Sequence, residues 1–80
     1  MVESKKIVNL LHSSIEASFL GKRISHKEMA DMLGISMRTY QEWRLGNNSP
    51  IAIKTIFKML GFLEEDEILR LIKKIKKGQP

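Results

Sequence analysis

The stretch ISHKEMADMLGISMRTYQEWRLGNNSP, from Ile24 to Pro50, decides how this chain folds. Ser25 precedes a helical run and Glu28 follows three residues later, a capping box in which the hydroxyl and the carboxylate each satisfy an unpaired backbone N–H group. Gly34 ends this run, because glycine adopts the left-handed conformation of a helix C-terminus without a Cβ clash. A second helical run begins almost at once, and two helices joined by so short a turn must cross sharply. The stretch therefore predicts a helix-turn-helix.

The second helix of the stretch has two chemically different sides. Ser36 can cap its start, and Gly46 ends it. At about 100° per residue, Tyr40 and Trp43 fall on one side, where we expect their rings to supply buried area. The other side carries four side chains that we expect to face away from the core: Met37, Arg38, Gln41 and Glu42.

Helical periodicity recurs along the rest of the chain, and a glycine follows each helical run. No segment alternates apolar and polar residues for long enough to indicate a strand. We therefore expect an all-α fold in which a single domain, residues 1–80, contains five helices. The expected helices cover approximately residues 4–20, 25–33, 36–45, 50–60 and 64–77.

The flanking helices carry apolar residues that we expect to cover the helix-turn-helix. In the first helix, the residues expected to face inward are Ile7, Val8, Leu11, Ile15 and Phe19. The fourth helix is expected to begin near Pro50, a favoured first-turn residue. Its residues expected to face inward are Ile53, Ile56, Phe57 and Leu60. The fifth helix starts in acidic EEDE and ends in basic KKIKK, and both ends suit the helix macrodipole.

Composition restricts the class of protein. The chain has 80 residues, of which 42% are hydrophobic and 29% charged, so it can form one modest core with little room for a deep catalytic cleft. It has no cysteine, and no apolar run approaches the ~20 residues that a membrane span needs. Its N-terminus lacks the long apolar core of a signal peptide, so we expect a cytoplasmic protein with no membrane partner.

Catalytic and metal-binding residues are scarce in this sequence. His12 and His26 are the only histidines, neither stands at metal-ligand spacing from a second ligand, and we expect both at the surface. Ser13 and Ser14 adjoin His12 only in sequence, because consecutive residues of a helix do not face each other. There is no glycine-rich phosphate loop. We therefore expect no enzymatic activity, no cofactor and no metal site.

The opening stretch resembles the lambda-repressor-like (Cro-type, XRE-like) helix-turn-helix family. A core that begins at His26 places Ala30, Gly34, Ile35, Tyr40 and Trp43 at the family's marked positions. Apolar residues fill the family's core positions, namely Met29, Leu33, Ile35, Tyr40 and Trp43. The likeness continues through GNNSP to Phe62, so it covers about half of the chain. At Arg44 the family often has glutamate, a difference that alters any ion pair between the first and third helices.

The resemblance implies a sequence-specific transcriptional regulator that binds double-stranded DNA, a repressor of phage or bacterial type, in the cytoplasm at the nucleoid. The third helix would then enter the major groove and read base edges with Met37, Arg38, Gln41 and Glu42. Arg38 can pair bidentately with guanine and Gln41 with adenine, while Glu42 can accept from cytosine. Met37 can touch a thymine methyl group.

The formal net charge of +5 favours an anionic partner, because lysine and arginine release counterions from the phosphates that they neutralise. Basic residues gather at the start of the second helix, where backbone N–H groups already attract phosphate. The expected phosphate contacts are Lys22, Arg23, Lys27, Ser36, Asn47, Asn48 and Ser49. The basic run at residues 73–77 leaves two alternatives, a solvated helix end or a second DNA contact.

Helix-turn-helix proteins commonly pair on half-sites about 34 Å apart, so we expect a homodimer. Its expected surface is the fifth helix, through Ile68, Leu71, Ile72 and Ile75, and the alternative is that all four residues cover the monomer core. A second class of function also fits the sequence. In this alternative the protein is an interaction module, such as an antitoxin or adaptor, that uses the same fold to bind a protein partner. Glu42 and the uncharged GNNSP loop favour that alternative.

Overall fold

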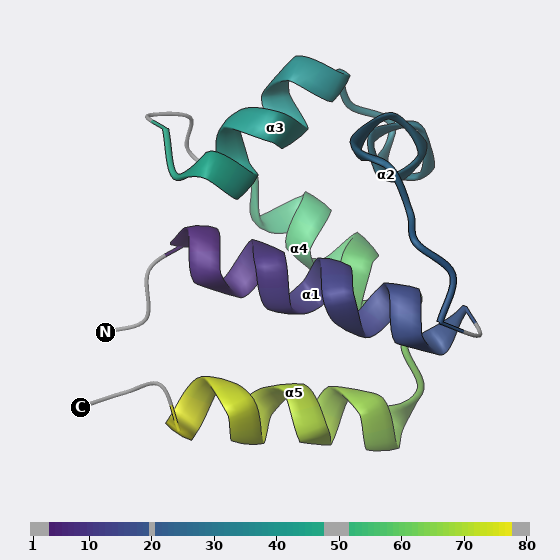
Figure 1. Ribbon diagram of the computed structural model, residues 1–80. Helices are drawn as coiled ribbons and strands as arrows, with labels where there is room; N and C mark the ends of the chain where they lie inside the picture. The colour runs from purple at the N-terminus through teal and green to yellow at the C-terminus, as the bar shows by residue number, and fades with distance from the viewer. Residues whose placement is uncertain (1–3, 20, 48–51, 78–80) are drawn as a thin grey trace.

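The computed structural model describes residues 4–19, 21–47 and 52–77, and its elements are five α-helices (Figure 1). They are α1 (Ser4–Ser18), α2 (His26–Leu33), α3 (Met37–Leu45), α4 (Ile53–Leu60) and α5 (Glu65–Lys77). There is no strand in the described part of the chain. The prediction of an all-α fold with five helices is confirmed for these residues. None of the described helices combines the length and the apolar character needed to cross a membrane.

Local hydrogen bonds define the ends of α2 as the sequence predicted. The Ser25 hydroxyl accepts from the Glu28 N–H at 3.0 Å, and the Glu28 carboxylate accepts from the Ser25 N–H at 3.3 Å. Gly34 ends α2 in the left-handed conformation with φ 71°, and the Ile35 N–H donates back to the Ala30 carbonyl. These bonds satisfy backbone groups that a helix end leaves unpaired. The chain consequently turns within a few residues and begins α3.

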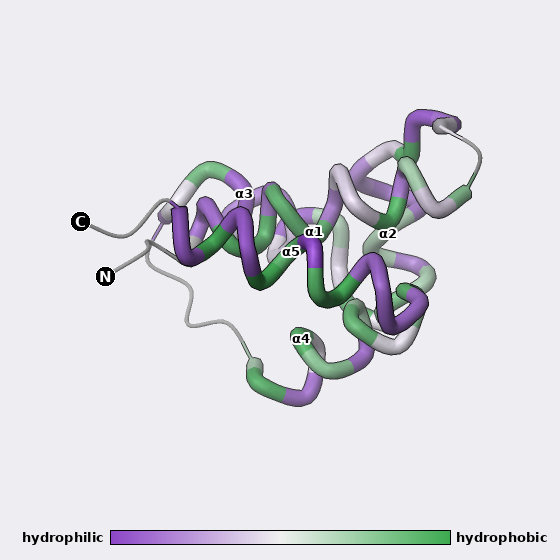
Figure 2. The backbone as a smooth tube through the Cα atoms, turned by 90° about the horizontal axis from the view of Figure 1, so that it is seen from below, coloured by the Kyte–Doolittle hydropathy of each residue, from purple (hydrophilic) through white to green (hydrophobic). Residues whose placement is uncertain are grey.

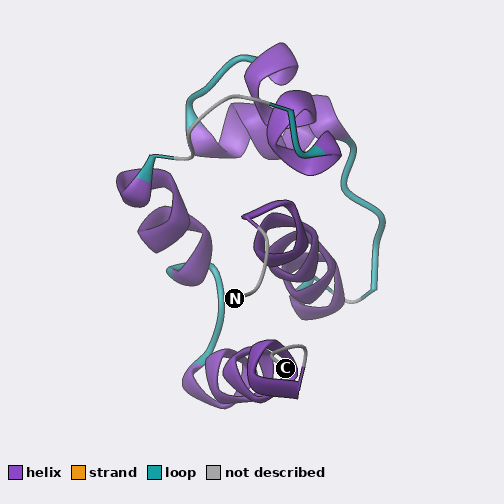
Figure 3. Ribbon diagram, turned by 90° about the vertical axis from the view of Figure 1, so that its left-hand side faces the viewer, coloured by secondary structure: helices purple, strands orange, loops and turns teal. Residues whose placement is uncertain are grey.

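The five helices are arranged in three groups along the molecule. Figure 3 shows α2 and α3 together at one end and α5 at the other, with α1 and α4 between them. α1 packs against α3, α4 and α5, so it connects the two ends of the molecule. Polar and apolar residues interchange along α1 and α5 in Figure 2, as expected for amphipathic helices that each cover the core with one side.

The core draws on every helix. Its fully buried side chains include Val8, Leu11 and Ile15 of α1, Met29 of α2 and Tyr40 of α3. Trp43 of α3, Met59 of α4 and Leu71 of α5 belong to the same buried cluster. The expected inward position of the α3 aromatic residues is confirmed by exposed fractions of 0% for Tyr40 and 4% for Trp43.

The predicted inward side of α4 is wrong in part. Ile53 and Phe57 are 70% and 67% exposed, whereas Thr55 and Met59 are buried. Ala52 has an extended conformation, with φ −69° and ψ 126°, so the helix begins at Ile53 and not near Pro50, which lies outside the described residues. The apolar side of α4 is wider than the surface it covers, and the helix packs through one edge of that side.

The exposure of Phe19 and of the apolar residues of α5 completes the comparison with the sequence prediction. Phe19 follows the end of α1 and is 40% exposed, so it does not extend the buried stripe of that helix. On α5, Leu71 is only 2% exposed and Ile68 and Ile75 pack against the core, so these three residues cover the core of the monomer. Of the four predicted residues, Ile72 is the one with substantial exposure, at 43%.

Candidate nucleic-acid interface

The outer side of α3 presents the residues expected to read bases. The Arg38 side chain is 89% exposed and Met37 is 45% exposed, while Gln41 and Glu42 are half-buried. Arg38 and Glu42 form an ion pair along the helix, with 3.5 Å between Nε and Oε1. The charge of Arg38 is thus partly balanced by Glu42, although its side chain remains open to solvent.

The basic residues at the start of α2 lie beside one end of this side of α3. Lys22, Arg23 and Lys27 are all exposed. Arg23 and Lys27 line an open groove of about 700 Å³, whose lining also includes Met37 and Arg44 of α3. The fold thus brings the phosphate-contact candidates of α2 and the first base-reading candidate of α3 to one concave surface, although Lys22 does not line it.

Other predicted phosphate contacts are placed differently. The Ser36 hydroxyl caps α3, because it accepts from the Thr39 N–H at 3.1 Å and donates to Thr39 Oγ1 at 2.8 Å. Its bonding capacity is thereby used within the helix. Asn47 is exposed just after α3, and its N–H donates to the Glu42 carbonyl. Asn48 and Ser49 lie outside the described residues.

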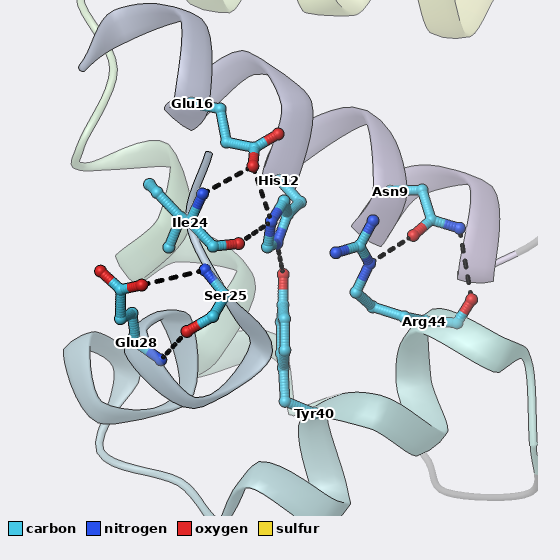
Figure 4. A network of polar contacts seen from close by, with 8 residues as sticks. All are labelled: Asn9, His12, Glu16, Ile24, Ser25, Glu28, Tyr40 and Arg44. Atoms are coloured by element: carbon cyan, nitrogen blue, oxygen red, sulfur yellow. Dashed lines mark hydrogen bonds and ion pairs between the residues drawn. The ribbon is translucent and has the colours of Figure 1, made fainter. Parts of the chain in front are cut away.

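A polar network behind the groove connects α1, the α1–α2 connection and α3 (Figure 4). His12 is buried, with 2.8 Å from Nε2 to the Ile24 carbonyl oxygen and 2.7 Å from Nδ1 to the Tyr40 hydroxyl. A carbonyl only accepts hydrogen bonds, so Nε2 carries the proton and donates to Ile24. Nδ1 then accepts from the Tyr40 hydroxyl, and both ring nitrogens of the neutral histidine are satisfied.

The same network holds the entrance to α2. Glu16 Oε2 accepts from the Ile24 N–H at 2.7 Å and lies 3.4 Å from His12 Nε2. His12 and Glu16 therefore bind both backbone groups of Ile24, which lies directly before the Ser25 cap and between Arg23 and Lys27. Two hydrogen bonds fix the backbone of Ile24, and its neighbours in the chain consequently have little conformational freedom. His12 and Glu16 of α1 therefore set the position of the α2 end of the groove.

A second link between α1 and α3 involves Arg44, at which the sequence departs from the family pattern. Arg44 Nε donates to Asn9 Oδ1 at 2.7 Å, and Asn9 Nδ2 donates to the Arg44 carbonyl at 3.3 Å (Figure 4). The two helices are thus joined by a charged donor and an amide. Because the Asn9 amide is neutral, this contact does not compensate the positive charge of Arg44. Arg44 also lines the groove.

The burial of His12 corrects the prediction that this histidine lies at the surface. His12 lies four residues from Val8 and three from Ile15, and both of those residues are buried. This helical spacing was the signal in the sequence. It was missed because the partners that make a buried imidazole acceptable, Ile24 and Tyr40, are remote along the chain. Burial lowers the pKa of His12 below its ordinary value of 6.5, and the charge of Arg44 adds to this effect.

Protein stability is consequently expected to depend on pH through His12. The unfolded chain gains a proton here near pH 6.5 and the folded chain only at lower pH, so the free energy of unfolding falls as the pH is lowered through this range. Urea unfolding at pH 7.5 and 5.5 measures the effect, with fluorescence of the single tryptophan, Trp43, as the probe. His12→Gln removes the titrating group. It is therefore expected to reduce the difference between the free energies of unfolding measured at the two pH values. An equal difference in both proteins contradicts this role of His12.

No group of three or more histidine, cysteine, aspartate or glutamate side chains able to hold a metal ion occurs among the described residues. Comparisons of the chain with protein-family models, curated proteins and solved structures each returned no match. The function proposed next therefore rests on the geometry and chemistry of the chain itself.

Proposed function

We propose that this protein is a sequence-specific DNA-binding regulator of transcription in which α2 and α3 act as a helix-turn-helix of the lambda-repressor-like type. The observation that carries the proposal is that Arg23 and Lys27 line one open groove with Met37, the first residue of the outer side of α3. Phosphates attract lysine and arginine regardless of sequence, whereas base edges are distinguished by side chains that reach into the groove. The two surfaces supply these two kinds of contact next to each other.

In the proposed complex, α3 lies in the major groove of double-stranded DNA and the α2 end approaches one strand. Arg23 and Lys27 contact phosphates, helped by the N-terminal end of α2. Arg38 forms a bidentate pair with guanine and Gln41 pairs with adenine. Repression is the activity that we propose for a regulator of this type in a bacterial or phage setting.

The ion pair between Arg38 and Glu42 gives the proposed reading side a means of discrimination. On DNA without a suitable guanine, Arg38 keeps its carboxylate partner at 3.5 Å and the negative charge of Glu42 opposes the phosphates. On the correct site, Arg38 exchanges this partner for guanine O6 and N7, and Glu42 accepts from a cytosine amino group. Exposed ion pairs contribute roughly 0.2 to 1 kcal/mol, so a good base contact exceeds the one that is lost.

Replacement of Arg38 tests the reading side. Arg38→Ala is expected to lower affinity for the selected DNA site by about 1 to 3 kcal/mol and to relax preference at one base pair. Glu42→Gln is expected to raise affinity for random DNA, because a charge that opposes phosphate is removed. Fluorescence anisotropy with selected and random duplexes measures both effects.

Arg70→Ala is the matched control for this test, since Arg70 also pairs with an acidic residue one helical turn away, Asp66, but lies on α5. It is expected to leave DNA binding unchanged. If Arg38→Ala and Glu42→Gln both behave like this control, α3 does not read DNA.

One observation favours a second function, a protein-interaction module such as an antitoxin or adaptor. Ile53 and Phe57 expose two large apolar side chains on neighbouring turns of α4, beside Lys54 and Lys58. Apolar residues gathered on one side of an exposed helix commonly mark contact with another protein. Ile53→Ser together with Phe57→Ser separates the two functions, because this change removes a protein contact at α4 without touching the proposed DNA surface.

A further inference from the structure

Met37 is the most exposed methionine in the described part of the chain. The chain contains five methionines, of which Met1 lies outside the described residues. Met29 and Met59 are fully buried in the core, with exposed fractions of 0%. Met32 is half-buried and packs against the same core cluster. Met37 is 45% exposed and lies outside that cluster, so it is the most accessible of these four side chains to a small reagent in solution.

The position of Met37 makes it part of the proposed DNA surface. It is the first residue of α3 and lines the open groove to which Arg23 and Lys27 also belong. In the proposed complex these two basic residues bind phosphates, and the start of α3 then lies against the edges of the bases. The apolar group that the major groove presents is the thymine methyl. A contact between this methyl group and Met37 requires the side chain to remain apolar.

We propose that Met37 is a site of reversible oxidation, through which hydrogen peroxide lowers the affinity of α3 for its DNA sequence. The sulfur of Met37 attacks one oxygen of the peroxide, so that an S–O bond forms and the O–O bond breaks. The departing hydroxide takes the proton of the transferred hydroxyl group and leaves as water. The sulfur is oxidised by two electrons to a sulfoxide and the peroxide is reduced. The effect on DNA binding rests on the function proposed above.

Oxidation changes the polarity of Met37 and leaves the charge of the protein as it was. A sulfoxide is polar where the thioether was apolar. Against a thymine methyl group, its oxygen loses water without gaining a hydrogen bond, and the loss of one base contact lowers affinity about tenfold. The phosphate contacts of Arg23 and Lys27 keep their charges, so affinity for random DNA and its salt dependence are expected to stay the same. General damage to the fold would lower both affinities.

The surroundings of Met37 allow the sulfoxide to form in the folded protein. The start of α3 is the positive end of the helix macrodipole, which suits the partial negative charge of a sulfoxide oxygen. The Ser36 cap of α3 bonds to Thr39 and does not involve the Met37 side chain. The residues that anchor α3, Tyr40 and Trp43, lie on its buried side. The oxidised protein therefore remains folded, and methionine sulfoxide reductases can reach the modified side chain.

Peroxide treatment of the full chain tests the site first without DNA. Peptide mass spectrometry follows sulfoxide formation at each methionine, and circular dichroism shows whether the protein stays folded. Met37 is expected to oxidise first, Met32 more slowly, and Met29 and Met59 only when the core opens. The selected duplex is expected to slow the oxidation of Met37 but not that of Met32, because α3 then lies in the major groove.

Anisotropy titrations before and after treatment measure the effect on DNA binding. Affinity for the selected site is expected to fall about tenfold, and methionine sulfoxide reductases with a thiol reductant are expected to restore it. Each variant is compared with itself before treatment. Met37→Leu is expected to show no change on treatment, because leucine has no sulfur to oxidise. Met32→Leu is the matched control and is expected to lose affinity as the unchanged protein does.

The possible failures are separable. Equal oxidation rates at Met37 and Met59, or unchanged affinity after full conversion of Met37 to the sulfoxide, overturn the proposal and leave the proposed function intact. An equal loss of affinity in treated Met37→Leu also overturns it, because oxidation elsewhere is then responsible. An untreated protein that selects no DNA sequence removes the proposed function and this inference with it.

Discussion

His12→Ala is expected to remove a large part of the folding free energy of this protein. The change opens a cavity between α1 and α3, and it leaves the Tyr40 hydroxyl and the Ile24 carbonyl without their buried partner. Cavity formation and unsatisfied polar groups together cost roughly 3 to 5 kcal/mol. A domain of 80 residues has about 4 to 12 kcal/mol in total, so the midpoint of urea unfolding is expected to fall strongly. Urea titration followed by Trp43 fluorescence gives the value.

Two other variants show whether the loss comes from the hydrogen-bond network. Tyr40→Phe keeps the ring and removes only the donor to His12 Nδ1, and we expect a loss of about 1 to 3 kcal/mol. His26→Ala removes the other histidine, which is partly exposed at the start of α2, and we expect a loss below about 1 kcal/mol. Equal losses for His12→Ala and His26→Ala would show that the buried network does not stabilise the domain.

The second large effect is expected at the basic start of α2. Replacement of Lys22, Arg23 and Lys27 by glutamine removes three charges that we propose to contact phosphates. Each phosphate contact contributes about −0.9 to the slope of log affinity against log salt, so the slope should become less steep by about 3. Affinity for random duplex DNA at ~0.1 M salt is expected to fall at least tenfold. Anisotropy titrations at several salt concentrations measure both quantities.

A matched triple variant distinguishes a local contact from the effect of total charge. Replacement of Lys73, Lys74 and Lys77 by glutamine also lowers the formal net charge from +5 to +2, since three positive charges are lost, but at the other end of the molecule. If this variant alters the salt slope as much as the α2 variant does, the basic end of α5 contacts DNA and the α2 surface is not the specific phosphate site.

The features that local sequence determines were predicted correctly. Ser25 and Glu28 cap α2 through bonds between residues three apart, and Gly34 needs no remote partner for its left-handed conformation. The inward side of α3 followed from the helical spacing of Tyr40 and Trp43. Each of these depends on a few consecutive residues, which is the range over which hydrogen bonding and periodicity act.

The features that depend on remote residues were not predictable. His12 is buried because Ile24 and Tyr40, far from it along the chain, satisfy both ring nitrogens. The orientation of α4 depends on how much surface the other helices offer, and its periodicity alone did not show that Phe57 would face outward. For the proposed site, residue types indicated the basic and polar surfaces, whereas the groove that joins Lys27 to Met37 required the three-dimensional arrangement.

The central claim is that the outer side of α3 reads the sequence of double-stranded DNA. Selection from a pool of duplexes with a randomised segment tests it most directly, by repeated binding and sequencing with the full chain and with Arg38→Ala in parallel. The unchanged protein is expected to enrich one short motif, and Arg38→Ala is expected to lose preference at a guanine within it. A pool that stays random after repeated rounds at low salt, or one motif selected equally by both proteins, would contradict it.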